Sequence, residues 1–325
     1  YMFSLVALLL SFTDSDRRFS LSKSSERTVP LWQYHILRLQ VFIVYFYGGL
    51  AKLNPDWLIC AEPIRSFVSY VFPEMVESDV FVSFFKYGGL LFDLLIGFLL
   101  FIKPTRMIAL IFVAFFNFSN AYIFDDIGIF PFIMFFATII FFSEDDIVVQ
   151  KIKGVLGMKP GIPQATQSSL PAFPKVLILF FCFQLLFPLR YILLPHDKDW
   201  TGIGQRFAWR MKIQSRPVEQ YEIYVTSPQI PGESQVQINT FINTMQMTVM
   251  SQDPVALWQF ANYVKQEALK QGIPEPEVHA RIRVSMNGSP EQYIVDPSVD
   301  LSMQDYDPLG YNEWIPERIG NCLDQ

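Results

Sequence analysis

One lysine at the end of a long apolar run is the first residue whose type and position suggest chemistry. Lys52 is the only ionisable cation between Ile43 and Leu53, and Asn54-Pro55 ends the predicted helix directly after it. At a water boundary, the lysine would extend its amine into solvent and act as an anchor. Turned toward the interior of a helical bundle, it would lose hydration, which favours a neutral amine able to take up a proton. Both interpretations are open at this point.

Three further polar side chains lie inside predicted membrane spans. Asp93 is near the middle of the run at 80–102, and Asn117 and Asn120 lie in the run at 107–124. An intramembrane carboxylate costs a few kcal/mol to insert, so it is normally paired, protonated or directed into a polar cavity. Buried amides orient a bound ring or carbonyl, or they join two helices by hydrogen bonds. We expect these residues either to line a site or to hold helices together.

Basic and aromatic side chains gather where the last apolar run ends. Arg206, Trp209 and Arg210 lie in the segment 200–216. Interfacial anchoring explains this composition as well as the binding of a carboxylate substrate by a guanidinium does. Arg65 lies in a shorter mixed segment at 58–72, which we expect to lie at the interface or to re-enter the membrane. We expect Arg65 to assist anion binding or helix docking.

The residues around Lys52 also carry a family resemblance. The pattern VYFYGGLAKLNPDW at 44–57, preceded by VPLWQYHILRLQVFI, resembles the vitamin K-dependent gamma-glutamyl carboxylase family, including bacterial and invertebrate homologues with an HTTM-type membrane domain. Further matches follow in chain order: YGGLLFDLLIGFLL at 87–100, IGIFPF at 127–132, WTGIGQRFAWRMKIQSR at 200–216, and VSMNG followed by YIVDPSVDL at 284–301. Five matches in order argue against coincidence.

The resemblance implies an activity. In this family, the lysine matched by Lys52 is the base that deprotonates reduced vitamin K. Molecular oxygen then adds, the strong base so formed removes a γ-proton of peptidyl glutamate, the carbanion takes up carbon dioxide, and the quinone leaves as epoxide. The enzyme is thus a carboxylase with vitamin K epoxidase activity, its co-substrates are O2 and CO2, and its partner is a glutamate-containing protein or peptide. The residues expected to bind reduced vitamin K are Tyr45, Asp93, Asn117 and Asn120. Those expected to bind the glutamate are Arg65, Arg206, Trp209 and Arg210.

Composition separates this chain from ordinary soluble domains. Hydrophobic residues make up 51% of the 325 and charged residues 17%, against roughly 25% charged in soluble domains. The shortage of charge predicts a membrane protein, and a net charge of −6 offers no basic face for nucleic acid. We find no phosphate-cradling glycine loop, serine-nucleophile elbow or Cys/His metal cluster in the sequence. The three cysteines show neither metal spacing nor a paired framework.

The predicted fold is an α-helical integral membrane bundle at 1–195 followed by a small mixed α/β, β-rich extramembrane domain at 196–325. The spans are expected at 33–53, 80–102, 107–124, 127–142 and 174–194, because a spanning helix needs about 20 apolar residues. In the second domain, alternation predicts strands at 219–227, 236–244, 279–287 and 291–297, and a helical period predicts an amphipathic helix at 254–271. The chain would be a multi-pass protein of the endoplasmic reticulum membrane if eukaryotic, or of the plasma membrane if bacterial.

Some features depart from the family pattern. The chain begins at Tyr1 inside an apolar run, so we expect a fragment that lacks an upstream Asn-His pair of the family. Asn117 stands where vertebrate members have a histidine. The alternatives are a membrane homologue that epoxidises the quinone with a different glutamyl substrate or none, or a non-enzymatic membrane binding protein.

Overall fold

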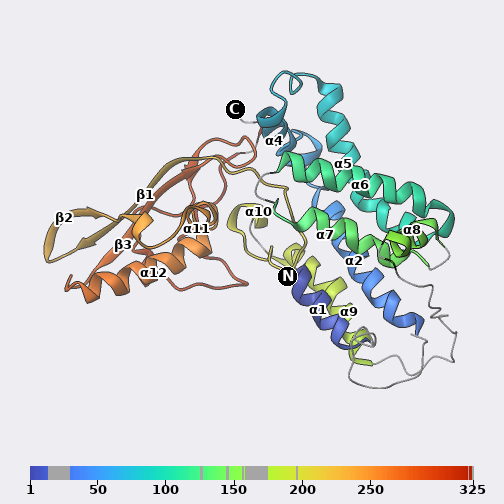
Figure 1. The fold of residues 1–325 in the computed structure, drawn as a ribbon. Helices are drawn as coiled ribbons and strands as arrows, with labels where there is room; N and C mark the ends of the chain where they lie inside the picture. The colour runs from blue at the N-terminus through green and yellow to red at the C-terminus, as the bar shows by residue number, and fades with distance from the viewer. Residues whose placement is uncertain are drawn as a thin grey trace. The chain divides into compact units, whose positions relative to one another are not determined.

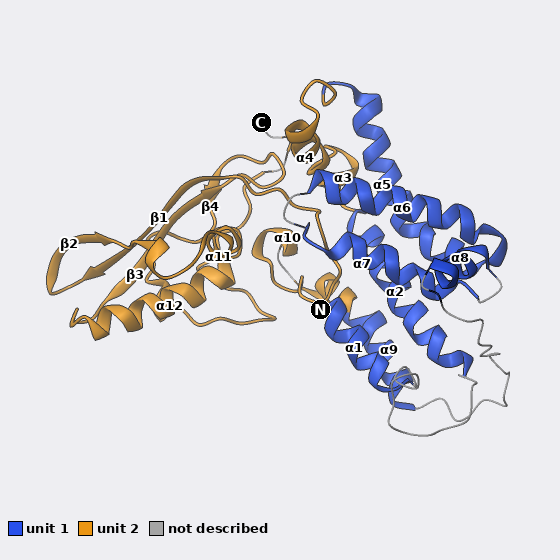
Figure 2. Cartoon of the chain, viewed as in Figure 1, with its two compact units in different colours: residues 1–53, 77–187 blue, residues 54–76, 188–325 orange. Residues whose placement is uncertain are grey.

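Two compact units make up the computed structural model, which describes residues 1–13, 30–124, 127–143, 146–155, 157, 175–194, 197–320 and 322–323. The first unit contains residues 1–53 and 77–187, and the second contains 54–76 and 188–325 (Figure 2). The chain therefore passes from one unit to the other after Leu53, after Val76 and after Phe187. The segment 54–76, which belongs to the second unit, begins two residues after Lys52.

The first unit is a bundle of helices (Figure 1). Its elements are α1 Met2–Ser11, α2 Leu31–Ala51, α5 Asp79–Phe101, η1 Lys103–Thr105, α6 Arg106–Ile123, α7 Phe130–Ala137, η3 Thr138–Phe141, α8 Ile147–Val155 and α9 Lys175–Leu186. The α-helix of α9 gives way to the 3-10 segment η4 Phe187–Leu193 just before Pro188, as the missing N–H of a proline requires.

The outer helices bury one narrow stripe and expose the rest. In α5 the buried positions Val82, Lys86, Leu90 and Asp93 recur every three or four residues, while large apolar side chains such as Leu91 are exposed between them. Helices α6 and α9 follow the same pattern. An apolar outer face suits contact with lipid. Within the part of the chain that the structure describes, three helical stretches are long and apolar enough to cross a membrane: Asp79–Phe101, Lys103–Ile123 and Lys175–Leu193.

These stretches confirm the helices expected at 80–102, 107–124 and 174–194. The other two expected spans differ for physical reasons. The run at 127–142 becomes the short helix α7 and the turn η3. Helix α2 has 21 residues, but it is not among the three stretches apolar enough to cross. It carries polar residues such as Gln33 and Gln40 and buries more of its surface than its neighbours do.

Polar contacts tie α2 to the surrounding elements. Gln184 Nε2 on α9 donates to Gln40 Oε1 at 3.1 Å, and the Tyr47 hydroxyl donates to the Leu185 carbonyl. Arg38 Nε donates to the Ile140 carbonyl at 2.9 Å, which satisfies a carbonyl at the end of η3. Helix α2 is therefore the central helix of this unit, and the elements around it are held at defined positions along its length.

The second unit has a mixed α/β fold. Its elements are α3 Pro55–Leu58, α4 Ile64–Val71, most of η4, α10 Lys198–Thr201, β1 Val218–Ser227, β2 Ile230–Gln235, η5 Ile238–Thr240, α11 Thr244–Met250, α12 Pro254–Lys270, β3 Glu277–Val284, β4 Gln292–Tyr293 and η6 Leu301–Met303. The four strands form one antiparallel sheet in the order β2-β1-β3-β4. The expected helical bundle followed by a small mixed α/β domain is confirmed.

The core of this unit lies between the sheet and α12, which runs along the sheet in Figure 1. Every second residue of β3 is fully buried, because successive side chains of a strand point to opposite faces. Tyr221 pairs with Ile282 and Ile223 with Ala280, so β1 and β3 present their apolar faces together. Helix α12 begins as expected at Pro254, where Asp253 accepts from the backbone N–H of Val255 at 2.9 Å.

One predicted strand is wrong. The segment 236–244 forms the turn η5 and then the start of α11, whereas the edge strand β2 lies earlier, at Ile230–Gln235. Asn243 and Gln246 form a capping box that begins α11, and this local signal outweighs the apolar alternation before it. The final expected strand, 291–297, is reduced to the two residues of β4.

The cysteine prediction is also wrong. Cys60 and Cys322, separated by 262 positions, form a disulfide with a Cα–Cα distance of 6.2 Å. Both belong to the second unit, so the bond holds the inserted segment 54–76 to the C-terminal part of the chain. Spacing in the sequence gives no sign of a pair so far apart. Disulfides form and persist mainly in oxidising environments. Cys182 is exposed on α9.

Candidate functional site

Lys52 is buried, with 7% of its surface exposed, at the end of α2. The helix stops because Asn54 begins the next one: its side chain accepts from the Trp57 N–H at 3.0 Å. The lysine side chain turns back along its own helix, where Nζ lies 3.5 Å from the Gly48 carbonyl oxygen. It also donates a hydrogen bond to Asp93 Oδ2 and forms an ion pair with it. The amine therefore faces the interior of the first unit instead of solvent.

Two glycines make this contact possible. A Cβ on Gly48 would lie 3.3 Å from Asp93 Oδ2, and a Cβ on Gly49 would lie 2.8 Å from the backbone nitrogen of Leu94. Helices α2 and α5 thus approach closely where the lysine meets the carboxylate, as small residues allow in membrane bundles. A third close approach lies farther along, where a Cβ on Gly97 would meet Phe42 at 2.4 Å.

Two of the expected cofactor-binding residues lie together beside this pair. Asn117 Nδ2 donates to the Tyr45 hydroxyl at 3.0 Å, and both residues are buried. Tyr45 makes an edge contact with Phe92 at 5.5 Å between ring centroids, and Phe92 stacks on Phe116 at 3.9 Å. Tyr45 also interacts electrostatically with Asp93, so this group of side chains lies beside the Lys52–Asp93 pair. Asn120 lies one turn beyond Asn117 and is partly buried.

The four residues expected at the glutamate differ in their surroundings within the second unit. Arg210 forms an ion pair with Asp199, with Nη2 at 2.6 Å from Oδ1, and only 2% of its side chain is exposed. Arg206 is exposed. Trp209 is buried, and its Nε1 has no hydrogen-bond partner among the described residues. Arg65 donates to the Val76 carbonyl at 3.2 Å. Arg210 is thus already paired, whereas Arg206 is an exposed residue.

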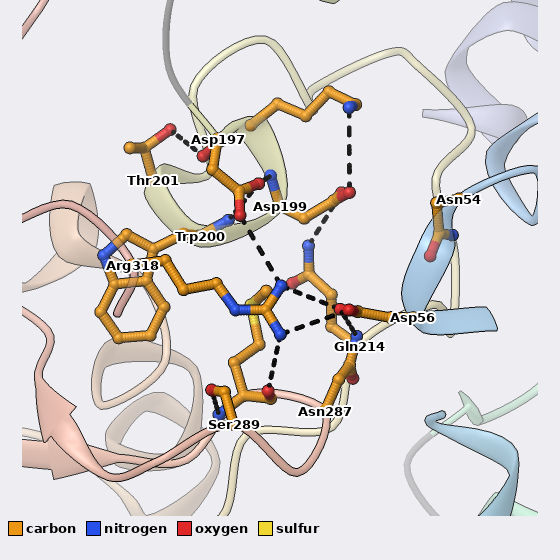
Figure 3. Close-up of polar contacts among 12 residues, drawn as sticks. Asn54, Asp56, Asp197, Asp199, Trp200, Thr201, Gln214, Asn287, Ser289 and Arg318 are labelled. Atoms are coloured by element: carbon orange, nitrogen blue, oxygen red, sulfur yellow. Dashed lines mark hydrogen bonds and ion pairs between the residues drawn. The ribbon is translucent and has the colours of Figure 1, made fainter. Parts of the chain in front are cut away.

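A polar cluster that the sequence did not reveal lies in the same unit (Figure 3). Arg318 donates from Nη1 to Asp56 Oδ2 at 2.9 Å and lies 3.7 Å from Asp197. Asn287 Nδ2 donates to Asp56 at 2.9 Å. These residues join three distant parts of the chain beside a pocket of about 450 Å³ that is also lined by Lys198. Two members of the cluster lie in patterns that the sequence analysis singles out: Asp56 in the run after Lys52, and Asn287 in VSMNG. Neither pattern indicates that the two residues meet.

Arg216 fixes the neighbouring turn. Its guanidinium is buried and donates to the Trp200 carbonyl at 2.8 Å and to the carbonyls of Asp199 and Gln252. Burial lowers the pKa of Arg216 to about 10, although the nearby carboxylates of Asp253 and Asp199 oppose this shift. The side chain therefore stays charged at neutral pH and holds α10 in place.

Removing the cation of the polar cluster should destabilise the second unit strongly. Arg318→Ala would leave the buried Asp56 carboxylate without its ion pair, and breaking a buried pair from one side costs about 3–5 kcal/mol. In a domain of this size, that cost corresponds to a melting temperature lowered by roughly 6–20 °C. Arg281→Ala is the matched control, because its pair with Glu233 is exposed and should matter little. The melting temperatures are measured by tryptophan fluorescence. Equal values for the two variants would contradict the stabilising role of the Arg318–Asp56 pair.

Comparison with known families defines the class of protein. Residues 1–146 match the HTTM domain, and residues 171–319 match the vitamin K-dependent gamma-carboxylase, lumenal domain. A helical membrane domain is therefore joined to a lumenal-type α/β domain in one chain. The chain belongs to the vitamin K-dependent gamma-carboxylase family. No solved structure matches it.

Proposed function

We propose that the protein is a vitamin K-dependent gamma-glutamyl carboxylase. It couples the oxygenation of reduced vitamin K to its epoxide with the carboxylation of protein glutamate to gamma-carboxyglutamate. The observation that carries the proposal is the burial of Lys52 against Asp93 in a chain of this family. A lysine kept only as an interfacial anchor would leave its amine in water.

Lys52 is the proposed catalytic base. Its Nζ would accept the acidic proton of the bound quinol, and the surrounding apolar and aromatic side chains would exclude water that could quench the reaction. Reduced vitamin K, when bound, supplies with O2 the strong base that activates glutamate for CO2 uptake.

The described residues fit a flat aromatic cofactor. Phe92 and Phe116 offer ring faces and edges, and aromatic pairs favour stacked or edge contacts. The buried Tyr45 and Asn117 and the partly buried Asn120 add polar groups, and the Asn117 amide donates a hydrogen bond to the Tyr45 hydroxyl, which holds it in a defined orientation. Tyr45, Asn117 and Asn120 are proposed to bind the quinol ring, and Asp93 to act beside them through its ion pair with Lys52.

The glutamate is proposed to bind at the basic and aromatic residues of the second unit. Arg206 is an exposed residue, and a guanidinium is suited to a bidentate pair with a substrate carboxylate. Arg65 and Trp209 would contribute from neighbouring segments. Arg210 could join them only by exchanging its ion pair with Asp199 for the substrate. The proposed enzyme is a multi-pass membrane protein, with the membrane chemistry in 1–195 and substrate recognition in 196–325 together with Arg65. The membrane is the endoplasmic reticulum in a eukaryote and the plasma membrane in a bacterium.

Substrate binding can be tested separately from quinol oxidation. Arg206→Ala should raise the KM for a glutamate peptide roughly 10-fold or more, because a hydrogen bond to a charged group contributes about 1.5–3 kcal/mol. Epoxide formation without peptide should persist. Arg283→Ala is the control, since this partly exposed arginine of β3 pairs with Glu291 instead. A KM for the peptide unchanged in Arg206→Ala would remove Arg206 from the proposed site.

The proposed function itself is tested by assaying the purified protein with reduced vitamin K and O2, with and without a glutamate peptide and CO2. We expect both epoxide and carboxylated peptide. Epoxide without carboxylation would favour a quinone-epoxidising homologue with another acceptor or none. Absence of both products from folded protein would favour a non-enzymatic binding protein.

A further inference from the structure

We propose that Asp93 is the positioning residue of the base: it fixes the Lys52 amine in place and takes up the proton that this amine must lose before it can accept another. The inference rests on the proposed function, since it concerns the same proton transfer. In this proposal Asp93 acts on the reaction by holding and deprotonating the Lys52 amine, without itself contacting the quinol.

The geometry of the pair carries this inference. Lys52 Nζ donates to Asp93 Oδ2, and the side chains are only 9% and 7% exposed. The Gly48 carbonyl, 3.5 Å away, is a second acceptor for the same amine. Because a Cβ on Gly48 would lie 3.3 Å from Asp93 Oδ2, the absence of a side chain there leaves room for the carboxylate. The amine is thus held between a helix carbonyl and a carboxylate on a different helix.

Charge explains why a carboxylate belongs there. An isolated ammonium or carboxylate inside a membrane bundle is strongly disfavoured, whereas the pair is neutral as a whole. The pair shares one proton, present either as ammonium with carboxylate or as amine with carboxylic acid. Transfer of that proton breaks one N–H bond of Lys52 and forms an O–H bond on Asp93. The nitrogen lone pair is then free without any charge having been created.

The charges formed when the amine accepts a proton from the substrate also favour a carboxylate next to Lys52. The free amine takes the O–H proton of the substrate, so that the pair becomes an ammonium and a carboxylic acid with a charge of +1. The substrate becomes an oxyanion with a charge of −1, and the site as a whole remains neutral. A cation formed next to a developing oxyanion stabilises it electrostatically.

The surroundings of Asp93 support a fixed position. Asp93 interacts electrostatically with Tyr45, whose hydroxyl is held by the Asn117 amide at 3.0 Å. Asn117 in turn donates to the Val113 carbonyl of its own helix at 2.9 Å. Three helices therefore fix the carboxylate and its neighbours.

The test uses Asp93→Asn and Asp93→Glu in the full chain, purified in detergent. We expect Asp93→Asn to lower kcat for epoxide formation at least 10-fold, with the KM for reduced vitamin K within about two-fold, because general acid–base effects act on the chemical step. Asp93→Glu should recover part of kcat. Asp79→Asn is the control, since Asp79 is an exposed aspartate at the start of the same helix.

A double-mutant cycle provides a readout independent of activity. Lys52→Ala and Asp93→Asn should each lower the melting temperature, and the double variant should lose less than the sum of the two shifts, because the partners form one unit. Additive shifts would show that the residues are not coupled and would overturn the inference. A raised KM with an unchanged kcat in Asp93→Asn would also overturn it, in favour of direct quinol contact. Lack of epoxide from the wild type would instead overturn the proposed function, while the cycle still tests the pair.

Discussion

Replacing Lys52 by alanine is expected to abolish epoxide formation and carbon dioxide incorporation together. The variant removes the proposed proton acceptor and leaves Asp93, with 5% of its surface exposed, without its cation. General acid–base catalysis contributes about 10²–10⁴-fold, so both rates should fall at least 100-fold. The measurement is epoxide formation by chromatography and labelled CO2 incorporation by scintillation, with the full chain and saturating reduced vitamin K.

The matched control for this variant is Lys86→Ala. Lys86 is also a buried lysine of the first unit, located on α5 with its amine 4.5 Å from the centre of the Tyr87 ring. Its loss should leave both activities largely intact. Small exogenous amines should restore part of the activity of Lys52→Ala, because only the proton acceptor is missing. Unchanged activity in Lys52→Ala would instead identify Lys52 as an anchoring residue.

Gly49→Ala is expected to reduce both stability and activity, because it separates the two helices that hold the base. The new Cβ would lie 2.8 Å from the backbone nitrogen of Leu94 and from its side chain. A backbone atom cannot rotate away, so α2 and α5 must move apart. Overpacking of this kind costs about 1–3 kcal/mol. Lys52 lies three residues after Gly49, and Asp93 directly precedes Leu94, so the ion pair should lengthen and kcat should fall.

Gly88→Ala separates this steric effect from helix propensity. A Cβ at Gly88, on α5, would meet nothing within 4 Å, so alanine there should be neutral or slightly stabilising. Melting temperature in detergent and kcat for epoxide formation should both distinguish the two variants. Comparable values for Gly49→Ala and Gly88→Ala would contradict the close helix approach as a requirement for activity.

The parts of the fold that the sequence predicts well are those with long, uniform patterns. The apolar runs predict α5, α6 and α9 correctly, because a long and mostly hydrophobic stretch has few structural alternatives. Helix α12 followed from its amphipathic period and from Asp253-Pro254 at its start. The segment 236–244 was misassigned because a short alternating pattern carries less information than the capping box that interrupts it.

The candidate site could be predicted residue by residue, but its contacts could not. Lys52 and Asp93 stood out as costly charges in apolar runs, yet no local pattern indicates that they pair across 41 positions. Their meeting depends on Gly48 and Gly49, whose effect is visible only in the packed helices. The same limit applies to the Cys60–Cys322 disulfide, which joins residues 262 positions apart.

The basic residues near the start of the α/β domain illustrate a further limit. Arg206 and Arg210 share the same sequence context, but only Arg210 forms an ion pair with the partly buried Asp199 carboxylate among the described residues. Which of two nearby arginines remains exposed depends on where Asp199 lies after folding. Composition therefore located a basic region without distinguishing a structural guanidinium from one free to bind a ligand.

The most direct measurement of the proposed function is the fate of isotopically labelled CO2. Wild-type protein in lipid nanodiscs is supplied with reduced vitamin K, O2 and a glutamate-containing peptide, and the peptide is analysed by mass spectrometry. We expect the label in a new carboxyl group on the γ-carbon of glutamate, only when both reduced vitamin K and O2 are present, and not with Lys52→Ala. A peptide without label, recovered from folded wild-type protein under these conditions, would contradict the assignment of this chain as a glutamyl carboxylase.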